Sequence, residues 1–133
     1  MRSFKLEIVS PDGQMFSGEA ERLLVRTSDG DVEILAGHTD LFATLAVGRV
    51  KLTTGGEVKY GSASGGFMTV KGGEVTLATI TFEFAEDIDE DRAERSKARA
   101  EEEIKTATDD KALDRAKARL QRALSRINVA NLK

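Results

Sequence analysis

The sequence lacks cysteine and has a single histidine, His38, among its 133 residues. Without thiols the chain can form neither disulfides nor thiolate metal sites, and a cysteine nucleophile is excluded. His38 stands in the stretch AGHTD, where nothing beyond Asp40 suggests a catalytic partner, so we interpret it as an ordinary loop histidine. The acidic runs at 86–91 and 101–103 are interpreted as solvated helix surface. We therefore expect no catalytic residue and no metal site.

Long apolar runs and a net positive charge are also absent. No segment approaches the roughly 20 apolar residues of a membrane-spanning helix, and the start MRSFKLEIVS has no run typical of a secretory signal. The formal net charge of -3 gives no general attraction to nucleic acid or anionic lipid. With 40% hydrophobic residues the chain can still bury a core. We expect a soluble, cytoplasmic chain that inserts into no membrane and binds no nucleic acid.

Residues 1–85 carry short segments in which apolar and polar residues alternate, as in FKLEIV and EVTLATITFEF. A period of two is typical of half-buried strands. The pairs Gly55-Gly56 and Gly72-Gly73 separate such segments and predict hairpin turns, because glycine adopts positive φ at little cost. Many short strands joined by tight turns predict an amino-terminal β-sandwich, or flattened barrel.

The composition changes near Ala85, where glycine and β-branched runs give way to Ala, Glu, Lys and Arg. Apolar residues then recur at helical spacing. The pattern predicts a first helix over about 88–105 and a second that begins after residue 108 or 109. Because the segment between them is short, we expect an antiparallel two-helix hairpin over residues 86–133. The predicted fold class is therefore α+β, with two domains, 1–85 and 86–133.

The predicted hairpin has charged ends and little apolar surface. Asp87 and Glu90 have the spacing of a capping pair at the start of the first helix. Buried apolar area stabilises by ~25 cal/mol per Å², so a seam of small residues stabilises less than one of leucines. We expect the hairpin to lie near the balance between docked and undocked states. The apolar residues of its first helix are mainly Ile88, Ala93, Ala100 and Ile104.

Arginines form a stripe along the second predicted helix. Like charges at i, i+4 destabilise a helix by a few tenths of a kcal/mol unless they are neutralised. One interpretation is that acids of the first helix neutralise them. The other is a polyanion site, in which Arg122 and Arg126 of this stripe converge with Arg92 and Arg99 on phosphate groups. No P-loop supports a nucleotide site, since the segment from Gly56 lacks its lysine. The stripe consists of Arg115, Arg119, Arg122 and Arg126.

The order of several stretches resembles the epsilon subunit of bacterial F-type ATP synthases. These stretches are EIVSPDG, RLLVRTSDGDVEILAGH, TLAVGRVKL, GGFMTV, EVTLATI and the closing RLQRALSRI. The resemblance implies a non-catalytic rotor subunit in the central stalk, on the cytoplasmic face of the bacterial cell membrane. Its sandwich would contact the gamma subunit and the c ring. Its hairpin would inhibit ATP hydrolysis by extending toward the alpha and beta subunits.

The stretch IDEDRA, residues 88–93, is similar to the I/L-D-x-x-R-A signature with which bacillus-type members bind ATP. The resemblance implies ATP as a regulatory ligand of the compact hairpin and no required cofactor; it leaves a role of magnesium open. One group of residues would shape the adenine and ribose side: Glu83, Ile88, Asp89 and Ala93. A second group would hold the phosphates: Arg92, Arg99, Arg122 and Arg126. The alternative is a purely structural interaction module whose hairpin docks permanently and binds no nucleotide.

Overall fold

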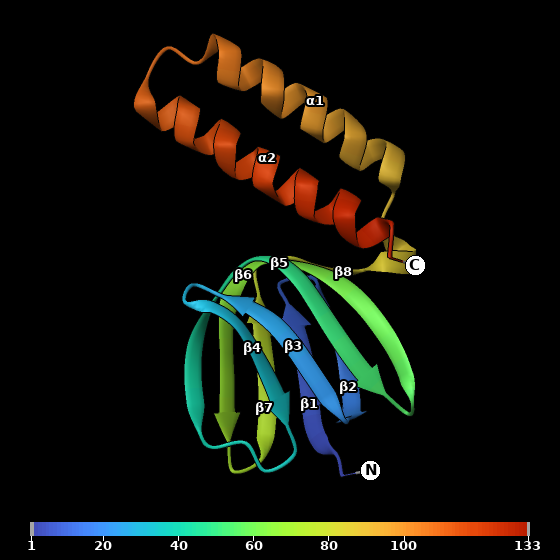
Figure 1. Ribbon diagram of the computed structural model, residues 1–133. Coiled ribbons are helices and arrows are strands. Elements are labelled where there is room, and N and C mark those ends of the chain that lie inside the picture. The colour runs from blue at the N-terminus through green and yellow to red at the C-terminus, as the bar shows by residue number, and fades with distance from the viewer. Residues whose placement is uncertain (1, 133) are drawn as a thin grey trace.

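Strands fill the first two thirds of the chain, and a helical hairpin stands at one end of them (Figure 1). A computed structural model describes residues 2–132. The strands are β1 (Phe4–Ser10), β2 (Gly13–Ala20), β3 (Arg22–Thr27), β4 (Gly30–Leu35), β5 (Leu41–Thr54), β6 (Glu57–Lys71), β7 (Glu74–Thr79) and β8 (Phe82–Phe84). A short 3-10 helix η1 (Ala85–Asp87) leads to the helices α1 (Glu90–Thr106) and α2 (Asp110–Ala130).

The strands form one hydrogen-bonded path in the order β2-β1-β7-β6-β5-β3-β4, with β8 paired to β6. The path folds over on itself into a sandwich (Figure 1). The pair β1 and β7 is parallel, and the other pairs are antiparallel. The predicted fold class, a β-sandwich followed by two helices, is confirmed.

Both predicted glycine turns are present. Gly55 and Gly56, with φ of 57° and 79°, join β5 to β6, and Gly72 and Gly73, with φ of 58° and 80°, join β6 to β7. Positive φ at both central residues is typical of the type I′ turn, whose twist matches that of the strands. The first turn fixes the register of the long β5–β6 ladder, in which Thr54 pairs with Glu57, and the second fixes that of β6 and β7, in which Lys71 pairs with Glu74.

The core lies between the two layers of the sandwich. Alternate residues of β1, β3 and β7 point into it, as the period of two predicts. The largest side chains that are almost wholly buried are Leu6, Ile8, Leu23, Ile34, Leu52, Met68 and Leu77.

The two helices begin at aspartate caps. The Asp89 carboxylate accepts a hydrogen bond from the Arg92 amide at 3.0 Å, and the Asp109 carboxylate accepts one from the Ala112 amide at 2.7 Å. The predicted cap at Asp87 was wrong. Asp87 is the last residue of η1, and the residue that caps α1 is Asp89, two positions later. Neither helix in the described part of the chain is long and apolar enough to cross a membrane.

Small side chains form the seam between α1 and α2. The residues at its centre are at most 2% exposed: Ala93, Ala100, Ala116 and Ala123. Ile88 does not belong to this seam, contrary to the prediction, because it precedes α1 and packs at the junction with the sandwich. The hairpin is therefore held together by close contact of small residues over a small apolar area.

The hairpin meets the sandwich at a junction near the end of α2. A small apolar cluster, the junction cluster, consists of Ala85, Ile88, Val129 and Ala130, with Tyr60 packed against it. Beside it, the hydroxyls of Ser62 on β6 and Ser125 on α2 lie 2.8 Å apart. The predicted helical domain also includes Lys133, which lies outside the described residues.

Candidate functional site

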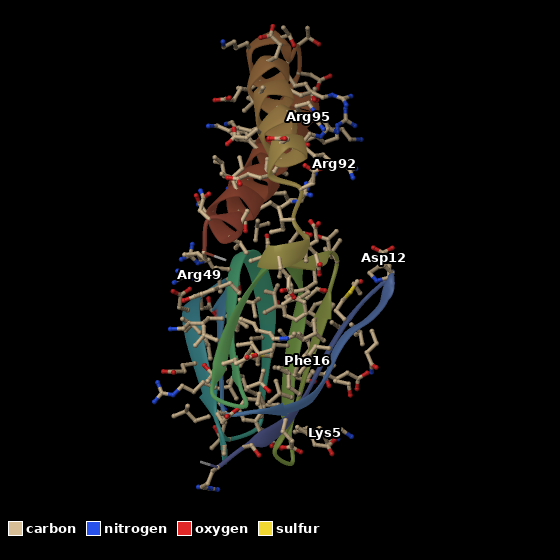
Figure 2. All side chains as sticks on the ribbon, turned by 90° about the vertical axis from the view of Figure 1, so that its right-hand side faces the viewer. Lys5, Asp12, Phe16, Arg49, Arg92 and Arg95 are labelled. Atoms are coloured by element: carbon tan, nitrogen blue, oxygen red, sulfur yellow. The ribbon has the colours of Figure 1, made fainter. Side chains whose placement is uncertain are left out.

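A groove of about 750 Å³ runs between the hairpin and the sandwich. Figure 2 shows its surroundings from the side, with Arg92 on the hairpin above Asp12 at the tip of the β1–β2 turn. Both helices, strands β2, β6 and β8, the short helix η1 and this turn contribute to its walls. Its lining residues are Asp12, Gln14, Met15, Ser62, Ser64, Thr81, Phe82, Glu83, Phe84, Asp87, Arg92, Ser96, Arg99, Arg119, Arg122, Ala123 and Arg126.

Arginines dominate the charge of this groove, which we call the arginine groove. Five arginines line it against three carboxylates, those of Asp12, Glu83 and Asp87. On each helix the arginines recur at three, four or seven residues, which places them on one face. The groove therefore presents an excess of guanidinium donors, whose planar geometry suits phosphate oxygens.

Glu83 neutralises the end of the groove nearest the sheet. Its Oε1 lies 2.7 Å from Nε of Arg126 without hydrogen-bond geometry, while Nη2 of Arg126 donates to Oε2 at 3.4 Å. The Arg126 side chain is 21% exposed, so this pair is better shielded than the other ion pairs of the hairpin. Because Glu83 lies on β8 and Arg126 on α2, the pair also ties the hairpin to the sandwich.

Glu103 neutralises the opposite end. Nη1 of Arg119 donates to both carboxylate oxygens of Glu103, at 2.7 Å for Oε2. Nε of Arg99 lies 3.4 Å from Oε1 of the same carboxylate. One carboxylate of α1 thus contacts two arginines that line the groove, one on each helix.

The middle of the groove has no such neutralisation. Among residues 2–132, no carboxylate lies within ion-pair distance of Arg92 or Arg122. Both side chains belong to exposed residues that line the groove. These two guanidinium groups are the ones most available to an anionic ligand.

The sequence-predicted site residues divide into two sets. Glu83 and the four predicted arginines line the same groove, so the structure brings them together. The other three are absent from its lining. Ile88 is buried in the junction cluster, Asp89 caps α1, and Ala93 is fully buried in the helix seam.

Several lining residues were missed by the sequence reasoning. Arg119 carries a signal, because it belongs to the stripe on α2, whereas Arg115 of the same stripe is not among the lining residues. Asp12, Gln14 and Met15 carry none, because they lie in the β1–β2 turn and at the start of β2, far along the chain from the hairpin. Only the packing of the sandwich brings that turn to the groove.

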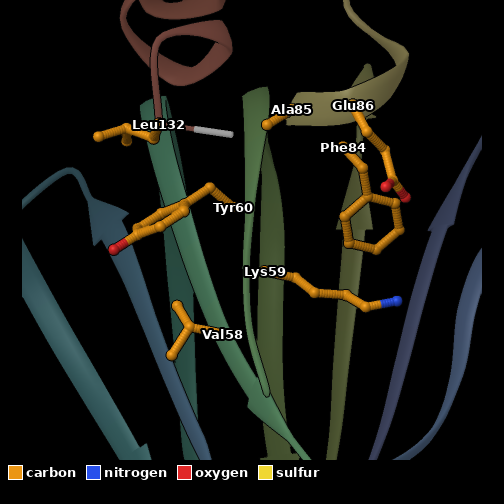
Figure 3. Close-up of a pocket in the computed structure, with 7 residues that line it drawn as sticks. All are labelled: Val58, Lys59, Tyr60, Phe84, Ala85, Glu86 and Leu132. Carbon is orange, nitrogen blue, oxygen red and sulfur yellow. The ribbon is translucent and has the colours of Figure 1, made fainter.

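A smaller pocket of about 190 Å³ lies on another part of the junction (Figure 3). It is lined mainly by apolar or aromatic groups, and the Lys59 ammonium lies 5.7 Å from the centroid of the Phe84 ring. Its lining has one cationic residue, Lys59, one anionic residue, Glu86, and no arginine. It therefore lacks the cationic excess of the arginine groove. Among residues 2–132 no cluster of three or more His, Asp or Glu residues could hold a metal ion.

Comparison with known proteins identifies the family. Residues 3–85 match the model of the ATP synthase delta/epsilon chain β-sandwich domain, and residues 86–131 match that of its long α-helix domain. The chain is 39% identical over 130 residues to the ATP synthase epsilon chain of Bacillus velezensis, covering 98% of both chains. It is also 39% identical over 134 residues to that of Ruminococcus albus, covering both chains fully.

Solved structures share the fold. A chain of the Euglena gracilis mitochondrial ATP synthase matches with a TM-score of 0.82 and 22% identity, over 98% of this chain and 82% of its own length. A chain of the central stalk and c ring of the Tetrahymena thermophila mitochondrial ATP synthase matches with a TM-score of 0.68 and 14% identity, over 98% and 96%. The relatives and the family models together confirm the resemblance seen in the sequence. The chain belongs to the ATP synthase delta/epsilon family, as an epsilon chain of the type found in Bacillus.

Proposed function

We propose that this chain is a non-catalytic rotor subunit of a bacterial F-type ATP synthase whose hairpin responds to ATP. In the docked hairpin, ATP binds in the arginine groove with its phosphates on Arg92, Arg99, Arg122 and Arg126. Without ATP the hairpin leaves the sandwich, extends toward the alpha and beta subunits and inhibits ATP hydrolysis. The subunit sits peripherally on the cytoplasmic face of the cell membrane and requires no cofactor.

The observation that carries the proposal is the uncompensated charge in the middle of the arginine groove. Arg92 on α1 and Arg122 on α2 face one groove with no carboxylate of residues 2–132 in ion-pair distance. A polyphosphate there would contact both helices and reach toward Glu83 on β8. A ligand that contacts all three elements only when the hairpin is docked stabilises the docked state.

The junction is small enough for such a ligand to shift the equilibrium. It consists of the junction cluster, one hydroxyl pair and the ion pair of Glu83 with Arg126. ATP at 100 times its dissociation constant would add about 2.7 kcal/mol to the docked state. We expect so small a junction to give a docking free energy of only about a few kcal/mol. The contribution of ATP is of the same size, so it can shift the docking equilibrium.

Three residues of the predicted site act from outside the lining of the groove. Because Ile88, Asp89 and Ala93 do not line the groove, we propose that they act by shaping it. Ile88 holds the hairpin on the sandwich, Asp89 fixes the first turn that carries Arg92, and Ala93 lets α2 approach closely. Substitution at these positions would then weaken ATP binding through hairpin geometry.

Calorimetric titration of the isolated chain with ATP tests the proposal. Arg92→Ala and Arg122→Ala should each weaken binding about 10- to 100-fold, since a charge-assisted hydrogen bond contributes about 1.5–3 kcal/mol. Arg95→Ala is the matched control, because Arg95 lies on α1 outside the groove lining (Figure 2). Hydrogen exchange should show ATP protecting the amides of both helices in the parent chain but not in the two groove variants.

The alternative is a permanently docked structural module. It is favoured by the carboxylate contacts of Arg99, Arg119 and Arg126, which already neutralise part of the groove. That function predicts no heat and no thermal shift at millimolar ATP. Either result in the parent chain would overturn the ATP-responsive hairpin and leave the rotor role in place.

The sandwich offers a separate surface for the rotor partners. Phe42 and Phe67 stack on its outer face with ring centroids 5.5 Å apart, at 66% and 51% exposure. Ile80, which lies beside Gly65 of β6, the strand of Phe67, is 62% exposed. We propose the gamma subunit as the occupant of this face, with the c ring as the second rotor partner of the sandwich. Phe42→Asp should abolish co-purification with a gamma-type subunit, while Val58→Asp, at another exposed apolar residue, should not.

A further inference from the structure

Glu103 occupies a special place at the far end of the arginine groove. Its carboxylate accepts hydrogen bonds from Nη1 of Arg119 on α2 and lies 3.4 Å from Nε of Arg99 on its own helix. Both arginines line the groove, whereas Glu103 does not. From outside the groove lining, the Glu103 carboxylate therefore contacts two arginines that could bind phosphate.

We infer that Glu103 is an internal competitor of the anionic ligand and sets the affinity of the groove for polyphosphate. This inference rests on the proposed nucleotide site and concerns its regulation. A phosphate chain that reaches Arg99 and Arg119 must share their donors with Glu103 or displace it. The net binding free energy is then the difference between the interaction of these arginines with phosphate and their interaction with the Glu103 carboxylate.

A purely structural role for Glu103 is less consistent with its surroundings. Its side chain is 37% exposed, that of Arg119 is 41% exposed and that of Arg99 is 77% exposed. Ion pairs this exposed contribute little to stability, because water and salt screen them. The helix seam beside them is already formed by buried alanines. Removing the charge of Glu103 should therefore leave the hairpin folded.

The two ends of the groove differ in this respect. Among residues 2–132 the Glu83 carboxylate forms an ion pair with Arg126 alone, and this pair ties the hairpin to the sandwich. Its loss would therefore weaken docking as well as free an arginine. In the part of the chain that the structure describes, the ion pairs of Glu103 lie within the hairpin and do not reach the sandwich. Substitution of Glu103 should therefore change the affinity for the ligand with little effect on the docking of the hairpin.

Calorimetric titration of the full chain with ATP and with inorganic tripolyphosphate tests the inference. Glu103→Gln keeps the shape of the side chain and a carbonyl acceptor but removes the competing charge. It should bind both probes about three- to tenfold more tightly than the parent chain. The matched control is Glu101→Gln, which removes one charge from an exposed residue of the same helix that has no ion pair in residues 2–132. It should stay within about twofold of the parent chain.

Arg119→Ala gives the opposite sign and separates competition from clamping. If Glu103 competes with the ligand, Arg119→Ala weakens binding while Glu103→Gln strengthens it. If the pair only clamps the helices, both variants weaken binding, which would overturn the inference. Equal affinities of the Glu103 and Glu101 variants would also overturn it, while ATP binding by the parent chain would leave the proposed site intact. Failure of the parent chain and of Glu103→Gln to bind either probe at millimolar concentration would overturn both proposals.

Discussion

Replacing Ile88 by alanine should release the hairpin from the sandwich without unfolding the sandwich. Ile88 is 4% exposed and contributes the largest aliphatic side chain of the junction cluster. The substitution removes three carbon atoms, which at ~0.8 kcal/mol each gives about 2.4 kcal/mol before any cavity term is added. With that term the loss should be about 2.5–4 kcal/mol. A difference of 2.4 kcal/mol corresponds to a shift of about 50-fold in the docking equilibrium.

Native-state hydrogen exchange measures this shift residue by residue. We expect amides of α1 and α2 to exchange about 50-fold faster or more in Ile88→Ala, because the hairpin opens as a separate unit. Amides near Leu6 and Leu77 in the core should keep their protection. Ile80→Ala is the matched control, because the same atoms are removed from a side chain that is 62% exposed. Its effect should be within about 0.5 kcal/mol.

Two outcomes would refute this reasoning. Equal loss of protection in the hairpin and in the sandwich core would show that the two parts unfold as one cooperative unit. Unchanged exchange of the hairpin amides would show that the junction cluster does not hold it. The ATP titration adds a second readout, since apparent affinity falls with the fraction of docked hairpin. Ile88→Ala should thus weaken ATP binding although Ile88 does not line the groove.

Two further predictions concern a glycine of the sandwich and the cap of α2. Gly66→Ala should destabilise the sandwich by several kcal/mol in urea unfolding, because the added Cβ would lie 2.0 Å from the Ala78 carbonyl oxygen at a φ of 115°. Gly13→Ala, with φ of 124° and nothing within 4 Å, is the control for backbone strain alone and should cost less. Asp109→Ala should destabilise the helical hairpin by about 1 kcal/mol through loss of the α2 cap, and Asp110→Ala by less, measured by thermal loss of helical circular dichroism. Equal effects within either pair would contradict the assigned cause.

The candidate site was predicted in part, and the division has a physical cause. Apart from Arg115, the arginines of the predicted stripe line one groove with Arg92 and Arg99, because helical periodicity depends only on neighbouring residues. Arg119 was visible in the same stripe, but its contact with Glu103 depends on how α1 packs against α2. Ile88 was assigned to the ligand side, whereas the junction buries it. Sequence spacing does not say which neighbour covers an apolar side chain.

The sequence by itself determined the local features of this protein. Period-two segments and the turns at Gly55-Gly56 and Gly72-Gly73 specify strands and hairpins, and Asp109 specifies the start of α2, through interactions between residues close in the chain. The tertiary structure decided which distant parts meet. It alone pairs β1 with β7, brings Asp12 to the groove and places Glu83 against Arg126. These contacts depend on burying one shared core and docking one hairpin, which no local pattern encodes.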